Sequence, residues 1–209
     1  MQLTVTTFLS VDGVYQGPGG PTEDTRDGFD RGGWLVPHFD DAAGHFIAQV
    51  FDQADAFLLG RTTYDIFNSF WPKVTDPDDP VASRLNTLPK YVASNSLQDP
   101  DWANTTVISG DVAAEVRRLK EQDGRELQVH GSGMLVRYLL EQDLVDRLNL
   151  MVFPVIVGAG RRLFPDNGPA TGLALDRSRT TGSGVEISVY RPAGRAEFGE
   201  VPGIDTFDR

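Results

Sequence analysis

The chain has 209 residues, of which 40% are hydrophobic and 23% are charged, as expected for one globular domain. Its net charge of −11 argues against nucleic acid or an anionic membrane surface as a partner, because both attract a positive field. The absence of cysteine excludes disulfides, thiolate nucleophiles and cysteine-ligated zinc. The N-terminus lacks the pattern of a signal peptide, and no apolar run is long enough for a membrane helix, so a soluble cytoplasmic protein is expected.

Predicted strands and helices alternate along the chain. Apolar and β-branched runs predict strands over 3–10, 56–59, 90–93, 105–109, 127–130 and 148–157. Helical spacing and capping residues predict helices over 40–53, 63–70, 81–88, 111–122 and 134–141. Two more strands, 173–181 and 185–190, are joined by a glycine-containing turn and predict an antiparallel hairpin.

This alternation predicts a three-layer α/β/α sandwich with a mostly parallel mixed sheet and the antiparallel hairpin at one edge. Residues 1–192 form the predicted domain, and 193–209 are interpreted as a C-terminal tail. The segment 11–33 is a long glycine-rich loop, and loops of this length inside a compact domain are typically functional or disordered.

Three glycine turns follow predicted strands. The first two, at 60–63 and 131–134, each lead from a strand into a helix, whose N-terminal N–H groups and dipole suit a phosphate. On neighbouring parallel strands they could hold both ends of a dinucleotide. The alternative is two ordinary capped helices with a solvated arginine at Arg61. The third turn, at 157–162, either brings Arg161 and Arg162 to the mouth of a site or is a tight surface turn.

Other site types lack their residues. The three histidines, His38, His45 and His130, do not have the spacing of a metal site, so no metal is expected. The hydrolase elbow G-x-S-x-G and the phosphate loop G-x-x-x-x-G-K-[ST] are both missing. The aromatic residues of 34–71 fit either the floor of an apolar pocket or ordinary core.

Five segments in order resemble the dihydrofolate-reductase-like family, and within it the branch related to the C-terminal reductase domain of the bifunctional riboflavin-biosynthesis deaminase/reductase. They are SVDG at 10–13, LGRTTY at 59–64, YVAS at 91–94, VHGSG at 129–133 and FPVIVGAGRRLF at 153–164. The resemblance implies NADPH bound across the carboxyl edge of the sheet, with catalysis mostly by positioning of two rings.

The resemblance also assigns expected roles to residues. The implied cofactor residues are Gly13 over the nicotinamide, Gly60, Arg61, Thr62 and Thr63 at the adenosine-side phosphates, Ser94 and Asn95 near the adenine ribose, and Gly131, Ser132, Gly133, Met134 and Leu135 at the pyrophosphate. The implied substrate residues are Trp34, Phe39, Asp41, His45 and Phe67. A cis peptide between Gly131 and Ser132 and a homodimer, built on strand 148–157 and the hairpin, are implied as well.

The expected function is an NADPH-dependent reductase of a small heterocyclic (pyrimidine- or pterin-like) or carbonyl substrate, resembling 5-amino-6-(5-phosphoribosylamino)uracil reductase. The alternative is a non-catalytic dinucleotide-binding protein of the same fold. Met134 stands where dihydrofolate reductases have an arginine, which argues against folate. Asp12 is the candidate catalytic residue, with an ordinary Asp-Gly turn as its alternative, and water is expected to deliver the proton.

Overall fold

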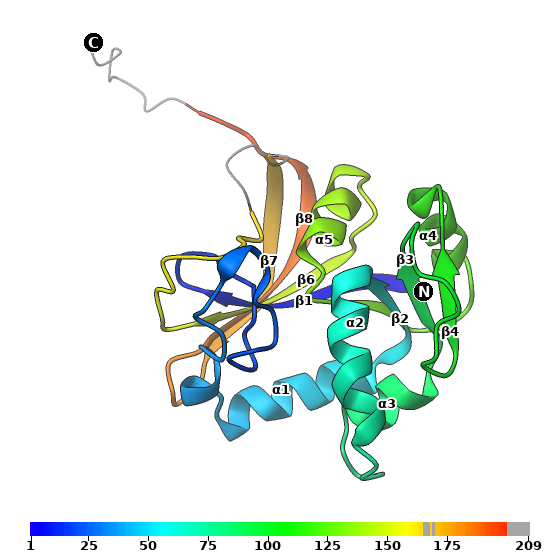
Figure 1. Cartoon of the computed structure of the whole chain (residues 1–209). Coiled ribbons are helices and arrows are strands. Elements are labelled where there is room, and N and C mark those ends of the chain that lie inside the picture. Colours follow the sequence, from blue (N-terminus) through cyan, green and yellow to red (C-terminus); the bar gives the residue numbers. More distant parts are fainter. Residues whose placement is uncertain (165–167, 169, 200–209) are drawn as a thin grey trace.

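The protein is described here by a computed structural model of residues 1–164, 168 and 170–199 (Figure 1). Its strands are β1 (Gln2–Ser10), β2 (Ala54–Gly60), β3 (Lys90–Ala93), β4 (Thr105–Ile108), β5 (Glu126–His130), β6 (Arg147–Phe153), β7 (Thr171–Thr180) and β8 (Glu186–Arg195). Its α-helices are α1 (Asp41–Asp52), α2 (Arg61–Phe70), α3 (Ala82–Thr87), α4 (Val112–Lys120) and α5 (Gly133–Glu141). The predicted order of strands and helices is confirmed.

The described strands form one sheet in the order β4-β3-β2-β5-β1-β6-β8-β7 (Figure 1). Strands β1 to β6 run parallel, whereas β8 is antiparallel to β6 and β7 is antiparallel to β8. The predicted mixed sheet with its C-terminal hairpin is therefore confirmed. Because β5 pairs with both β1 and β2, the carboxyl ends of these three parallel strands lie together at one edge of the sheet.

Two apolar clusters, one on each face of the sheet, make the three layers. On β2, Phe57 and Leu59 pack in the cluster that includes α1, whereas Ala56 and Leu58 pack in the cluster that includes α4 and α5. This alternation is the two-residue period of a strand covered on both faces. None of the helices among the described residues is long and apolar enough to cross a bilayer.

Two of the predicted boundaries at the C-terminal part of the chain are wrong. Strand β6 ends at Phe153 and not at Val157, because Pro154 has no N–H group to continue the ladder. Strand β8 continues to Arg195, beyond the predicted end at Tyr190 and into the segment interpreted as a tail. Residues 200–209 of that segment lie outside the described residues.

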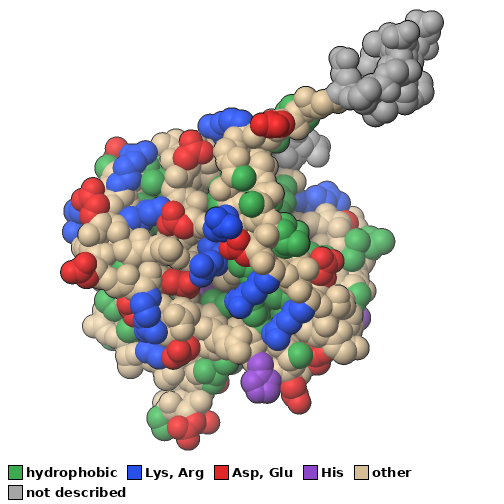
Figure 2. Space-filling model, turned by 180° about the vertical axis from the view of Figure 1, so that it is seen from behind, with side chains coloured by type: hydrophobic (Ala, Val, Ile, Leu, Met, Phe, Trp, Pro, Cys, Tyr) green, Lys and Arg blue, Asp and Glu red, His purple; other side chains and the backbone are tan. Residues whose placement is uncertain are grey.

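The strand that was expected, with the hairpin, to supply a dimer surface lies inside the sheet. Strand β6 lies between β1 and β8 and is largely buried. The edge of the sheet on this side is β7, where Leu173 is 41% and Leu175 is 54% exposed. Figure 2 shows the molecule from behind, with basic, acidic and hydrophobic side chains interspersed over that face.

Candidate functional site

A cavity of about 1150 Å³ opens at the carboxyl ends of β1, β2 and β5. Its lining includes the turns after β2 and β5, part of the glycine-rich loop, and one face each of α1 and α2. Its apolar lining residues include Leu35, Phe39, Ile47, Phe51 and Phe67. A crevice outside the carboxyl ends of parallel strands is the usual ligand position in open α/β sheets.

The two predicted glycine turns meet at this cavity and are hydrogen-bonded to each other. The Gly60 N–H donates to Ser132 Oγ at 3.0 Å, and the Ser132 N–H donates to Thr63 Oγ1 at 3.1 Å. Gly60, Thr63 and Ser132 all line the cavity. In both contacts the hydroxyl oxygen is the acceptor, so each hydroxyl keeps its hydrogen for a further acceptor such as a phosphate oxygen.

The helices that start at these turns differ from the others in their N-terminal caps. Aspartates at positions 40, 79 and 111 accept hydrogen bonds from N–H groups at the starts of α1, α3 and α4, respectively. Helices α2 and α5 have no side-chain cap from any residue in the described ranges. Their free N–H groups and positive dipole ends therefore face the cavity and favour an anion there.

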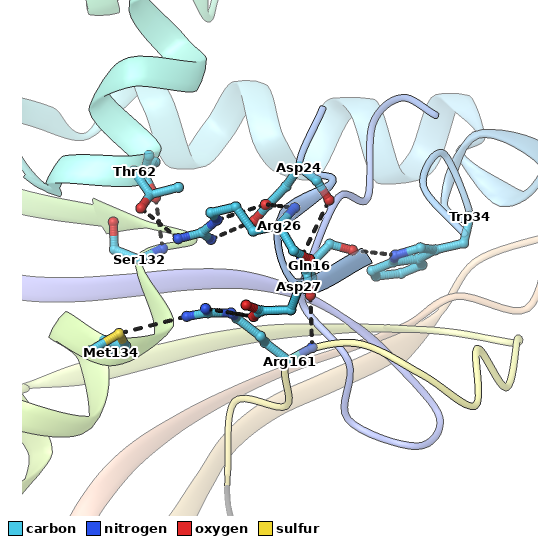
Figure 3. A network of polar contacts seen from close by, with 10 residues as sticks. Gln16, Asp24, Arg26, Asp27, Trp34, Thr62, Ser132, Met134 and Arg161 are labelled. Atoms are coloured by element: carbon cyan, nitrogen blue, oxygen red, sulfur yellow. Dashed lines mark hydrogen bonds and ion pairs between the residues drawn. The ribbon is translucent and has the colours of Figure 1, made fainter. Parts of the chain in front are cut away.

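Arg26 reaches from the glycine-rich loop to the start of α2 (Figure 3). Its Nε and Nη2 atoms pair with the two carboxylate oxygens of Asp24 at 2.7 and 2.5 Å. Its Nη1 atom donates to Thr62 Oγ1 at 2.7 Å. The hydrogen bond to Asp24 raises the pKa of Arg26, and although burial opposes it, the Arg26 contacts lower the pKa of Asp24. The guanidinium of Arg26 is thus held in one orientation, with its Nη1 atom directed at the N-terminus of α2.

Arg161 has a similar but looser arrangement at the start of α5 (Figure 3). Its Nε and Nη2 atoms both bond to Asp27 Oδ2, at 3.0 and 2.7 Å. Its Nη1 atom lies 3.9 Å from Met134 Sδ. The backbone N–H of Arg161 donates to Gln16 Oε1 at 3.0 Å, which connects this turn to the glycine-rich loop. Met134 stands where dihydrofolate reductases have an arginine, and the guanidinium of Arg161 lies beside it from another turn.

Arg161, predicted as a possible residue at the mouth of a site, lines the cavity, and so does Arg26, which the sequence motifs do not indicate. The signal for Arg26 was its position in the long loop after the first strand. Gln16 organises this loop, and no motif in the sequence indicates it. Gln16 is buried, and its side-chain Nε2 donates to the backbone carbonyls of Asp24 and Arg26. The backbone carbonyl of Gln16 accepts from Trp34 Nε1 at 2.8 Å.

Most expected cofactor residues line the cavity. These are Gly60, Arg61, Thr62, Thr63, Gly131, Ser132, Gly133, Met134 and Leu135. The other three are not among the lining residues. Ser94 Oγ accepts from the N–H groups that follow it, Asn95 Oδ1 accepts from the Gly110 N–H, and Gly13 turns the backbone at φ 78°. Their contacts shape loops next to the site.

The expected substrate residues are divided. Phe39 and Phe67 line the cavity, whereas Trp34, Asp41 and His45 are not among its lining residues. Trp34 is 7% exposed and packs in the core. Asp41 and His45 are exposed on α1, where His45 Nδ1 lies 2.8 Å from the Asp41 carbonyl oxygen.

Asp12 lies outside the cavity lining and joins two loops. It accepts hydrogen bonds from the Ser10 hydroxyl at 2.6 Å and from the N–H groups of Val157 and Gly158 at 3.0 and 2.9 Å. Burial alone would raise its pKa, but these hydrogen bonds lower the pKa of Asp12 to about 2. This geometry favours the turn interpretation over the catalytic one.

Asp12→Asn is expected to lower the free energy of unfolding at pH 7 by about 1–2 kcal/mol, because the amide presents only one oxygen to these donors. Urea unfolding measures this loss of stability, and Asp30→Asn, at an exposed aspartate, is the control. The hydride transfer that the resemblance implies is expected to stay within about tenfold of wild type in the folded variant. Loss of a hundredfold or more with cofactor binding intact would restore Asp12 as a proton donor.

The implied cis peptide between Gly131 and Ser132 is wrong, since the described part of the chain contains no cis peptide. Instead, Gly131 and Ser132 adopt left-handed φ values of 55° and 49°. Two successive left-handed residues turn the chain from β5 into α5. A side chain at position 133 is excluded for a different reason. A Cβ there would lie 2.4 Å from Cζ of Tyr15, whose ring packs against the turn.

His130 ends β5 and lines the cavity, although only 6% of it is exposed. Its ring stacks on Phe51 with 4.4 Å between ring centroids. Burial lowers the pKa of His130 to about 3, so the imidazole is neutral near pH 7. No motif around His130 in the sequence indicates a role for its side chain.

The chain is similar to known proteins along most of its length. The family model of the RibD C-terminal domain matches residues 1–187. YyaP of Bacillus subtilis (strain 168) is 30% identical over 184 residues, which cover 87% of this chain and 90% of YyaP. YwjB of the same organism is 26% identical over 158 residues, 76% of this chain and 85% of YwjB.

Solved structures show the same fold. A protein from Shewanella sp. PV-4 named for riboflavin biosynthesis has a TM-score of 0.69 at 22% identity, over 92% of this chain and 99% of that one. A diaminohydroxyphosphoribosylaminopyrimidine deaminase/5-amino-6-(5-phosphoribosylamino)uracil reductase of Thermotoga maritima has a TM-score of 0.60 at 14% identity. That match covers 92% of this chain and 56% of the Thermotoga chain. The chain therefore belongs to the RibD C-terminal domain family, a family of reductase-like domains.

Proposed function

We propose that the protein is an NADPH-dependent reductase of a small heterocyclic or carbonyl substrate. The observation that carries the proposal is the pair of helix N-termini without side-chain caps, α2 and α5, at one cavity. A dinucleotide carries anionic phosphates that suit both positions. The membership in a reductase-like family supports hydride transfer as the reaction.

The residues of the cavity fit such a cofactor. Thr7 of β1 lines the cavity, and its buried hydroxyl has no hydrogen-bond partner among the described residues. Such a hydroxyl costs free energy, and a small shift of the Thr7 side chain toward a ligand amide or hydroxyl would relieve this cost. The polar turns at Gly60 and Gly131 adjoin the apolar lining of α1 and α2, so one cavity offers both a phosphate region and a ring-binding region.

When bound, NADPH supplies the hydride, and the chain's own residues bind, orient and exclude water. In this proposal the starts of α2 and α5, with Arg26 and Arg161, hold the phosphates. Apolar residues of α1 and α2 hold the substrate ring and keep bulk water from the reacting centre. Water delivers the proton, because the candidate acid Asp12 lies away from the cavity lining.

Preference for NADPH over NADH is expected to depend on Arg61. This residue starts α2, lines the cavity and pairs with Asp65 at 2.8 Å, with 40% of its side chain exposed. A charge-assisted bond from Arg61 to the additional phosphate would favour NADPH by roughly tenfold or more. Calorimetric titration with both cofactors measures the ratio, and Arg61→Ala is expected to bring it near one. An unchanged ratio in this variant contradicts the assignment.

Cofactor oxidation in the presence of pterins, pyrimidines and quinones tests the proposed function. Turnover of NADPH, followed by the loss of its absorbance, is the expected result with at least one of these substrates. Tight NADPH binding without turnover across this panel favours a non-catalytic dinucleotide-binding protein. Absence of NADPH binding overturns both functions.

We also propose a homodimer whose interface includes the edge strand β7 and its exposed side chains Leu173 and Leu175. Light scattering at micromolar concentration is expected to give twice the 22.9 kDa mass of one chain. Leu175→Lys would place a charge at that interface and is expected to shift the mass toward the monomer. A monomeric wild-type protein at that concentration rules the dimer out.

A further inference from the structure

A row of buried polar side chains lies beneath the apolar part of the cavity. Thr6 of β1 is in register with His130 of β5 and with Asn149 of β6, so the three side chains are neighbours on one face of the sheet. They are 2%, 6% and 4% exposed, respectively. Buried polar groups are costly unless they have hydrogen-bond partners, so a row of them below an apolar pocket requires a reason.

The contacts of Gln128 fix which nitrogen of His130 carries the hydrogen. Gln128 Nε2 donates to the Val50 carbonyl at 2.6 Å and to Glu126 Oε2 at 2.7 Å. Gln128 Oε1, which can only accept, lies 3.0 Å from His130 Nε2. The Nε2 atom therefore carries the hydrogen, and Nδ1 has a free lone pair. Arg147 holds Glu126 in place at 3.0 Å.

This arrangement leaves one donor and one acceptor free at the cavity floor. Thr6 Oγ1 accepts from Asn149 Nδ2 at 3.1 Å, and its hydroxyl hydrogen has no acceptor in the described ranges. His130 Nδ1 likewise has no partner among the residues described. Both residues line the cavity from adjacent strands. Neighbouring strands lie about 4.8 Å apart, so the two side chains are close enough to contact one ligand ring together.

We propose that Thr6 and His130 recognise a planar heterocyclic substrate by an edge on which an N–H group stands next to a carbonyl. His130 Nδ1 accepts the N–H, and the Thr6 hydroxyl donates to the carbonyl oxygen. Gln128 and Glu126 are positioning residues that hold the imidazole in the Nε2–H form. The aromatic and aliphatic side chains around the pair, such as Phe51 and Phe39, contact the faces and other edges of the ring. The assignment of this ring as substrate rests on the proposed function.

Two fluorescent ligands test the edge recognition. Lumazine carries N–H groups next to carbonyls, and in dimethyllumazine both N–H groups are methylated. Fluorescence titration is expected to show wild-type protein binding lumazine at least about tenfold more tightly than the methylated ligand, as for one hydrogen bond lost in a buried site. His130→Phe keeps a ring on Phe51 and is expected to reduce this ratio to within about twofold. Thr6→Val is expected to weaken lumazine binding about tenfold.

A matched control uses the same strand. Thr4 is buried on the same face as Thr6 but does not line the cavity, so Thr4→Val is expected to leave the affinity for lumazine within about twofold. NADPH binding is measured on all four proteins and is expected to stay within about twofold, which separates this proposal from the proposed function. Wild-type protein that binds NADPH but not lumazine, or variants that keep the full lumazine ratio, would overturn the proposal.

Nitrogen NMR of the wild-type protein gives a second readout that does not depend on a variant folding. The chain has three histidines, so the signals of His130 can be assigned with His38→Gln and His45→Gln. The expected spectrum is a neutral ring with the hydrogen on Nε2, and lumazine is expected to shift the Nδ1 signal in the direction of a hydrogen-bonded nitrogen. An Nδ1–H tautomer, or no shift at saturating lumazine, contradicts the proposal.

Discussion

Arg26→Ala and Arg161→Ala are each expected to weaken NADPH binding by roughly ten- to a hundredfold, the usual value of a charge-assisted hydrogen bond. The two guanidinium groups share one design. Each has its Nε and Nη2 side bound to an aspartate and its Nη1 atom directed at the start of a helix, at Thr62 for Arg26 and at Met134 for Arg161. Because the aspartate contacts already fix these side chains, little conformational entropy is lost when a phosphate binds.

Calorimetric titration of NADPH measures the loss. The control is Arg179→Ala, since Arg179 lies on β7, over Phe46 and away from the cavity lining. Reduced nicotinamide mononucleotide, which lacks the adenosine half, is expected to lose less affinity than NADPH in the variants. Folded Arg26→Ala and Arg161→Ala proteins that bind NADPH within twofold of wild type would refute this role. Affinity is also expected to fall with added salt, because the contacts are ionic.

The strands, the helices and the two glycine turns could be predicted because their signals are local. On α1, Phe46, Ile47, Val50 and Phe51 repeat at helical spacing, and all four are buried. A strand, a glycine and a helix in succession define each turn without reference to the rest of the chain. A change of direction such as the end of β6 at Pro154 was also local, and the prediction failed there because the apolar run continues past it.

The site was less predictable because its contacts join distant segments. Arg26 meets Thr62, and Arg161 meets Asp27, through folding of two loops that no periodicity describes. Asp12 illustrates the limit. An Asp-Gly pair has the same sequence whether its carboxylate faces a substrate or, as here, the backbone of Val157 and a neighbouring residue. Tertiary contacts decide such roles, so local patterns leave both interpretations open.

The buried imidazole of His130 is expected to make the protein less stable as the pH falls. Burial lowers the pKa of His130 to about 3, whereas an unfolded histidine has a pKa of about 6.5. Between these values the unfolded chain binds a proton that the folded chain does not, so the free energy of unfolding decreases as pH falls through this range. From pH 7 to pH 5 the decrease due to this one residue is about 2 kcal/mol.

Urea unfolding at several pH values, compared between wild type and His130→Phe, isolates this contribution. Phenylalanine keeps an aromatic ring on Phe51 and has no titrating group, so the stability of the variant is expected to fall about 2 kcal/mol less from pH 7 to pH 5. Exposed His45 provides the control, and His45→Gln is expected to keep the wild-type slope. Carboxylates such as Asp12, with its pKa of about 2, lose their contribution at lower pH than this window. If the free energy of unfolding had the same pH dependence in wild type and His130→Phe, folding would not lower the pKa of His130. The imidazole would then accept a proton as readily in the folded protein as in the unfolded chain, and its Nδ1 lone pair would not be kept free by burial.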